Sequence, residues 1–145
     1  ERALTRPVSD LRRIGGRRGS TRDENGIRIG ALTTWTDIIR ADLPAAFDGL
    51  KLAAREVGSV QVQNAGTVAG NLCNASPAAD GVPPLLTLDA EVEMQSVQGA
   101  RRRPLGDFVL GNRRTALTEG ELATAIHIPR RAPRKQALCP KADLR

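Results

Sequence analysis

The sequence predicts an α+β fold, with short helices flanking a mixed or antiparallel sheet. Apolar residues recur at helical spacing in residues 44–57, whereas they alternate with other residues in segments 27–31 and 122–128. Helix-type and strand-type segments do not alternate regularly, as they would in a parallel βαβ fold. With 145 residues, of which 40% are hydrophobic, the chain can build one domain with a sizeable core, and it is not a disordered sequence.

The first half of the chain predicts a loop, a strand and two helices. Residues 15–26 are rich in glycine and charge and predict an exposed loop. Alternation in residues 27–31 predicts a short strand. Thr34 followed by Asp37 is typical of a capping box at a helix start, and a second helix is expected over 42–57.

The second half predicts mainly hairpin strands. A proline pair opens a helical turn over 83–88, and residues 91–104 predict a hairpin that turns at a Gln-Gly pair. Residues 105–110 predict another helical turn. A final strand over 122–128 should end at Pro129, because proline has no backbone N–H to donate.

Charge is distributed unevenly along the chain. The formal net charge is +6, but residues 1–28 carry +4 and residues 97–145 carry +7, whereas residues 29–96 carry −5. Nucleic-acid modules more often concentrate basic residues on one face, and aromatic side chains for base stacking make up only 2% here. We therefore expect no nucleic acid as partner. We expect solvated surface for the triplet Arg101–Arg103 and for the pairs Arg17-Arg18, Arg113-Arg114 and Arg130-Arg131, with a patch for a protein partner or RNA as the alternative.

Residue types that usually carry catalysis or metals are scarce. Cys73 and Cys139 form no CxxC pattern and are expected to be free thiols. His127 is the only histidine in the sequence, and we expect it exposed or half-exposed and without a catalytic or metal role. The sequence shows no signal peptide and no membrane span, so we expect a cytoplasmic protein. Because residue 1 is Glu, we expect the sequence to begin inside a longer gene product.

An uncharged run over residues 57–79 is the most informative segment. Its centre, residues 67–71, reads Thr-Val-Ala-Gly-Asn, and such small residues let another group approach the main chain closely. Backbone N–H groups in such a turn can form an anion nest, particularly if Asn71–Ala75 opens a helix. A pyrophosphate would suit these neutral donors. The alternative is a purely structural loop of small residues.

Five motifs follow one another along the chain: IGALTT (29–34), TVAGNLCNASPAAD (67–80), PPLLTLDAEVEM (83–94), GDFVLGNRRTAL (106–117) and ELATAIHIP (121–129). Through them the segment from Ile27 to Pro129 resembles the FAD-binding subunit or domain of the xanthine dehydrogenase and carbon monoxide dehydrogenase family of molybdenum hydroxylases. The resemblance implies the second subdomain of a PCMH-like FAD-binding fold.

The resemblance also implies which residues bind FAD. The family's loop that embraces the FAD pyrophosphate matches Thr67, Val68, Ala69, Gly70 and Asn71. Asn74 matches a polar residue that forms a hydrogen bond with the cofactor, and Asp80 matches an aspartate expected to accept from a hydroxyl of the FAD chain. Ala123 falls where the main chain touches the flavin, and Lys141 falls where a lysine lies near the isoalloxazine.

Set against the family, the chain is expected to be truncated at both ends. Residues 1–26 would be a remnant of the first FAD-binding subdomain with its loop, 27–129 the second subdomain, and 130–145 the start of a linker and C-terminal domain. Two departures stand out. Ala69 replaces a usual glycine, and the family's earlier Ala-Gly-Gly-Thr-like loop has no counterpart.

The implied function is electron transfer in an oxidoreductase complex. A molybdenum-cofactor subunit and an iron–sulfur subunit are the implied partners, and FAD would pass electrons to NAD, a quinone or oxygen. No catalytic acid or base is implied on this chain. The alternative is a flavin-free remnant or interaction scaffold of the same fold.

Overall fold

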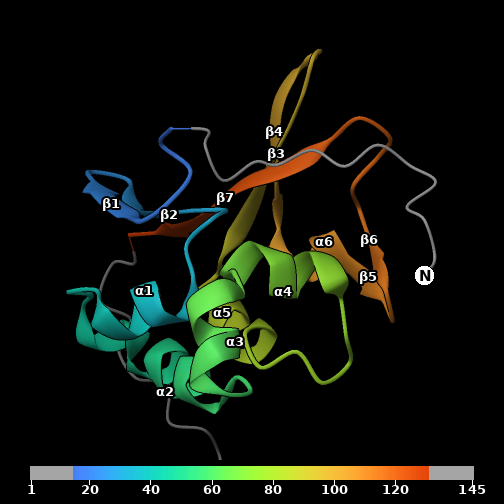
Figure 1. Cartoon of the computed structure of the whole chain (residues 1–145). Helices are drawn as coiled ribbons and strands as arrows, with labels where there is room; N and C mark the ends of the chain where they lie inside the picture. Colours follow the sequence, from blue (N-terminus) through green and yellow to red (C-terminus); the bar gives the residue numbers. More distant parts are fainter. Residues whose placement is uncertain (1–14, 131–145) are drawn as a thin grey trace, which may run out of the picture.

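A five-stranded antiparallel sheet forms the frame of the molecule, and the helices gather on one side of it (Figure 1). The computed structural model describes residues 15–130. In order across the sheet, the strands are β1 (Ser20–Asp23), β2 (Gly26–Gly30), β7 (Leu122–Pro129), β3 (Glu91–Ser96) and β4 (Gly99–Pro104). The expected α+β class is confirmed.

The helices are short. In chain order they are α1 (Trp35–Arg40), the 3₁₀ turn η1 (Ala45–Phe47), α2 (Asp48–Glu56), α3 (Val60–Ala65), α4 (Val68–Asn74), α5 (Val82–Thr87) and α6 (Leu105–Phe108). A small separate hairpin consists of β5 (Val109–Gly111) and β6 (Arg114–Thr115). One hydrophobic core lies between sheet and helices, and it includes the fully buried side chains Ile29, Ile38, Leu50, Leu85 and Ile126.

Several local predictions are confirmed. Thr34 and Asp37 form the capping box at the start of α1: the Thr34 hydroxyl accepts from the Asp37 N–H at 3.1 Å, and the Asp37 carboxylate accepts from the Thr34 N–H at 3.0 Å. The β3–β4 hairpin and the final strand ending at Pro129 also form as expected. These features depend on neighbours in sequence, which explains why local patterns reveal them.

The expected loop over 15–26 is wrong in part, because it contains strand β1. All four residues of β1 are exposed, so no alternation of apolar side chains marks the strand. The strand exists because the chain folds back on β2 through a tight turn. In that turn Asp23 Oδ1 accepts from the N–H groups of Asn25 and Gly26 at 2.8 and 3.0 Å.

The uncharged run is helical over most of its length. It contains α3 and α4, and because α4 begins at Val68, Asn71–Ala75 does not open a helix. Thr67 is the N-cap, and its hydroxyl accepts from the Gly70 N–H at 3.0 Å. A Cβ at Gly70 would lie 2.7 Å from that same hydroxyl oxygen, so the cap explains why glycine is needed there.

The Arg101–Arg103 triplet is only partly the solvated surface that was expected. Arg102 and Arg103 are exposed, but Arg101 is half-buried and paired with Glu121. His127 is half-buried, in agreement with the prediction. Among residues 15–130, no helix is long and apolar enough to cross a membrane, and no group of three or more His, Cys, Asp or Glu side chains is placed to hold a metal ion.

Candidate functional site

The N-terminus of α4 is held firmly against the start of α1. Thr34 and Thr67 form an isolated antiparallel bridge. Beside it, the N–H of Val68 donates to the carbonyl of Thr33 at 3.0 Å. In the same way, the N–H of Trp35 donates to the carbonyl of Gly66 at 3.2 Å. The backbone of α4 also packs against β7. The helix that carries most of the candidate residues is thus fixed at its start and along its length.

Four of the candidate residues share one face of α4. Thr67, Gly70, Asn71 and Asn74 follow the spacing of a single helical face, and each of them is at least partly exposed. We call these four residues the α4 polar face. None of them carries a charge, so the face offers only neutral donors and acceptors. Because Gly70 has no side chain, the middle of this face has space for a ligand to approach the backbone.

Val68 and Ala69 face the opposite way. Val68 is fully buried and Ala69 is 4% exposed, so both side chains belong to the core. Any contact that these two residues make with a ligand is therefore restricted to the main chain. The replacement of the family's usual glycine by Ala69 places the methyl group in the core rather than in the way of a ligand.

The backbone amides of this turn do not form the expected anion nest. The N–H of Val68 donates to Thr33, that of Gly70 to the Thr67 hydroxyl, and that of Asn71 to the Thr67 carbonyl. In the described part of the chain, the Ala69 N–H is left without a hydrogen-bond partner. The nest prediction is therefore wrong for three of the amides, because the start of α4 uses them for its own capping.

Asn71 carries a buried acceptor with no donor. Its Oδ1 is inaccessible to solvent and has no hydrogen-bond partner among the described residues. The oxygen faces Gly81, where a Cβ would lie 3.1 Å from it and 2.6 Å from a ring carbon of Trp35. An unpaired buried acceptor costs about 1–3 kcal/mol, which a donor from a bound molecule would offset.

Asn74 is fixed by a residue far away in the sequence. Its Oδ1 accepts from Arg113 Nη1 at 2.9 Å, and the Arg113 N–H donates to the carbonyl of Ala75 at 2.8 Å. Ala75 ends the helix in the left-handed conformation, with φ of 46°. The sequence reasoning missed Arg113, although it lies inside one of the motifs that carry the resemblance.

The remaining candidates lie at different distances from this face. Asp80 is exposed in the turn before α5. Its neighbour Gly81 lies close to Asn71, since a Cβ added at Gly81 would be 3.1 Å from Asn71 Oδ1, and that turn is therefore near the α4 polar face. Ala123 is half-buried on β7, the strand on which α4 packs. Lys141 lies outside the described residues, as does Cys139. Burial raises the pKa of the Cys73 thiol, so this half-buried cysteine on α4 is an unreactive thiol at neutral pH.

A second polar cluster lies at the centre of the sheet, around Glu93. Thr124 Oγ1 donates to Glu93 Oε1 at 2.6 Å, and His127 Nε2 lies 2.7 Å from Glu93 Oε2. Burial alone raises the pKa of Glu93, but the hydrogen bonds from Thr124 and His127 outweigh it, so this pKa lies below its ordinary value. The polar side chains of this cluster form hydrogen bonds with one another, which is typical of a structural network.

Known proteins resemble this chain in sequence and fold. A family described as "FAD binding domain in molybdopterin dehydrogenase" matches residues 2–131. The nicotinate dehydrogenase FAD-subunit of Eubacterium barkeri is 44% identical over 116 residues, which cover 74% of this chain and 38% of that protein. The carbon monoxide dehydrogenase medium chain of Afipia carboxidovorans is 34% identical over 121 residues, or 83% of this chain and 42% of the relative.

Solved structures show the same fold. The carbon monoxide dehydrogenase from Oligotropha carboxidovorans superposes with a TM-score of 0.78 at 34% identity, covering 83% of this chain and 42% of the other. The quinoline 2-oxidoreductase from Pseudomonas putida 86 gives a TM-score of 0.73 at 26% identity, with the same shares covered. The chain therefore spans about two fifths of the length of the relatives it matches.

Proposed function

The chain belongs to the family of FAD-binding domains found in molybdopterin dehydrogenases, and from this premise we propose that it builds one wall of an FAD site along the α4 polar face. One observation supports this most. Thr67, Gly70, Asn71 and Asn74, which the resemblance assigns to FAD binding, share one accessible face of a firmly held helix.

The proposed roles follow from the chemistry of each group. Gly70 lets the pyrophosphate approach the helix backbone at the start of α4. The amides of Asn71 and Asn74 offer neutral hydrogen bonds, and the Asp80 carboxylate accepts from a hydroxyl of the FAD chain. FAD, when bound, supplies the redox chemistry, whereas these residues bind and orient it. No acid or base on this chain is required.

At the level of the whole protein, we propose an electron-transfer subunit of a molybdenum hydroxylase-type dehydrogenase. Electrons would come from a molybdenum-cofactor subunit through an iron–sulfur subunit, and would leave to NAD, a quinone or oxygen. The relatives named above are described as an FAD-subunit and a medium chain, which is consistent with such a division of labour. Ala123 and Lys141 remain proposed contacts of the isoalloxazine.

A second candidate is a flavin-free scaffold of the same fold. It is favoured by the internal use of three of the four amides at residues 68–71, which leaves little main-chain capacity for a phosphate. The two functions differ in one measurable property, the affinity of the chain for FAD.

The test is a titration of the full chain with FAD. Trp35 is the single tryptophan of the sequence, and its ring lies against Gly81 beside Asn71, so bound FAD should quench its fluorescence. Asn71→Asp keeps the shape but adds a negative charge to the α4 polar face, and its folding is checked by circular dichroism. We expect it to raise the Kd at least tenfold, whereas the control Asn25→Asp, in the distant β1–β2 turn, should change it less than twofold. A colourless chain whose fluorescence does not respond to FAD would support the scaffold instead.

A further inference from the structure

Cationic side chains strengthen many phosphate sites, and the α4 polar face has none of its own. Arginine suits pyrophosphate because its guanidinium remains charged and donates several hydrogen bonds in a fixed plane. Within the described residues, Arg113 is the cationic side chain that forms a hydrogen bond with a member of this face. Neither the family resemblance nor the proposed function gives this residue a role.

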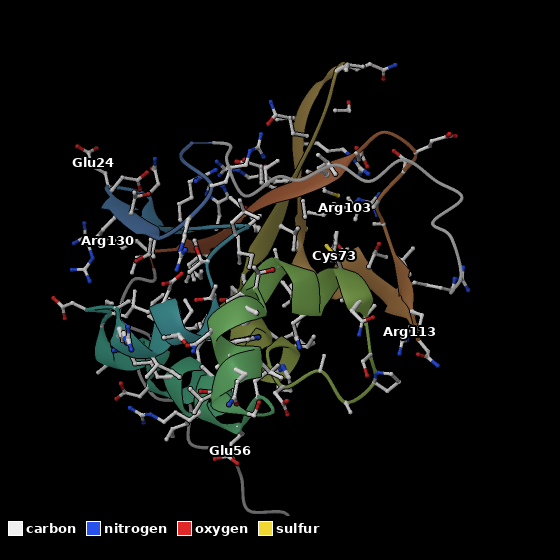
Figure 2. All side chains as sticks on the ribbon, in the orientation of Figure 1. Glu24, Glu56, Cys73, Arg103, Arg113 and Arg130 are labelled. Carbon is white, nitrogen blue, oxygen red and sulfur yellow. The ribbon has the colours of Figure 1, made fainter. Side chains whose placement is uncertain are left out.

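Arg113 is held at two points. It lies in the tight turn between β5 and β6 with φ of 56°, and its N–H donates to the carbonyl of Ala75 at the end of α4. Its side chain then reaches Asn74, with Nη1 2.9 Å from Oδ1. β6 packs beside α4, and Figure 2 shows the Arg113 side chain at the end of the small hairpin. The backbone anchor positions the guanidinium relative to the helix.

This contact determines how the Asn74 amide is oriented. A guanidinium can only donate hydrogen bonds, so the atom of Asn74 that faces it must be the oxygen. The Asn74 Nδ2 is then directed away from Arg113 and has no acceptor among the described residues. Because Asn74 is exposed, this N–H₂ group is available to an acceptor from outside the chain.

We propose that Arg113 is a positioning residue of the FAD site. By fixing the oxygen of Asn74, it presents the Asn74 N–H₂ group as a donor to a pyrophosphate oxygen of FAD, and its own charge favours an anion bound along the α4 polar face. The inference rests on the proposed function, because it assigns a new residue to the same site. It also gives the site the cation that the α4 polar face lacks.

The experiment compares neighbouring arginines in the full chain, with the Kd for FAD measured by Trp35 fluorescence. Arg113→Gln removes the charge and leaves the Asn74 amide free to rotate, so we expect the Kd to rise about tenfold. Arg113→Lys keeps the charge and one donor and should restore part of the affinity. Arg114→Gln is the matched control, because this adjacent arginine is also exposed and no side-chain contact to α4 involves it. We expect it to change the Kd less than twofold.

Asn74→Asp separates positioning from a merely structural role. A carboxylate pairs with Arg113 at least as well as an amide oxygen does, so the link between α4 and the small hairpin is kept. The N–H₂ donor is lost, and the remaining carboxylate oxygen repels the pyrophosphate. We expect an unchanged or higher thermal midpoint for the FAD-free chain, together with a Kd raised more than tenfold.

Each outcome decides between the proposals. If the wild-type chain binds FAD and Arg113→Gln binds it as tightly as Arg114→Gln, the positioning role is wrong although the proposed function stands. If Asn74→Asp bound FAD as tightly as the wild-type chain, the positioning role of Arg113 would also be wrong. If the wild-type chain shows no FAD binding, the proposed function fails for this chain, and the role of Arg113 fails with it.

Discussion

Arg101 on β4 and Glu121, the residue before β7, form a two-armed ion pair in which Nε lies 2.6 Å from Oε1 and Nη2 lies 2.7 Å from Oε2. Arg101 Nη2 also donates to the carbonyl of Ala116 at 2.9 Å, and Glu121 Oε2 accepts from the N–H of Thr118 at 2.9 Å. The pair therefore closes the loop between β6 and β7 and directs the chain into the strand that carries Ala123.

The pH dependence of folding should report this ion pair. The hydrogen bonds from Arg101, followed by the one from the Thr118 N–H, lower the pKa of Glu121 from 4.5 to about 2. Because the folded-state pKa is the lower one, the stabilisation is present above pH 4.5 and is lost as the pH falls toward 2. We expect Glu121→Gln to be less stable than wild type at pH 7, and this difference to shrink between pH 4.5 and 2, in urea unfolding followed by circular dichroism. Glu119→Gln, an exposed neighbour, is the control. An equal difference at every pH would contradict the prediction.

The cluster around Glu93 should contribute more to stability than its neighbour on the same strand. Glu93 accepts from Thr124 and contacts His127, whereas Glu91 makes no comparable side-chain contact within residues 15–130. Removing a charged acceptor costs about 1.5–3 kcal/mol for a hydrogen bond of this kind. We therefore expect Glu93→Ala to lower the free energy of unfolding by about that amount, and Glu91→Ala to lower it by less than about 0.5 kcal/mol. Equal losses would show that the cluster is not a structural network.

Gly81 should not tolerate a side chain. Its Cβ would lie 2.6 Å from a Trp35 ring carbon and 3.1 Å from Asn71 Oδ1, and Trp35 is only 1% exposed. Overpacking of this kind costs about 1–3 kcal/mol, so Gly81→Ala should destabilise the chain and shift the Trp35 emission. Gly49→Ala is the matched control, because nothing lies within 4 Å of its Cβ position on α2. We expect it to stabilise the chain by about 0.5–1 kcal/mol, since alanine is the better helix former. If Gly81→Ala left the free energy of unfolding unchanged, the Trp35 ring would be free to move away from residue 81.

Short-range features were predictable from the sequence, and long-range ones were not. The capping box of Thr34 and Asp37 is visible because its two residues lie three positions apart. The family motifs also led us to expect FAD contacts at Thr67, Gly70, Asn71 and Asn74, but the sequence did not show that these four residues share a helix face. The start of α4 could not be read from the uncharged run, because the run contains several residues that can cap a helix. In the fold, Thr67 is the cap, and it is also bridged to Thr34.

Tertiary pairing explains what the sequence could not show. Arg113 and Asn74 are 39 positions apart, and Arg101 and Glu121 are 20 apart, so no local spacing connects them. The arginines looked alike as surface charges, yet several of them, including Arg18 with Asp37, hold specific partners in the fold. Strand β1 escaped prediction for the same reason, because it is defined by its pairing with β2 and not by its own side chains.

The Thr67 cap should connect stability with FAD binding. Its hydroxyl satisfies the Gly70 N–H at 3.0 Å, so Thr67→Ala frees that amide while weakening the start of α4. Loss of such a cap costs about 1 kcal/mol. Thr67→Ser keeps the acceptor and should restore the stability measured by urea unfolding. If the cap only orders the helix, Thr67→Ala should weaken FAD binding. If the internal use of the Gly70 amide limits phosphate binding, the freed N–H should instead strengthen FAD binding despite the lower stability. We expect weaker binding, because the α4 polar face requires a well-formed first turn.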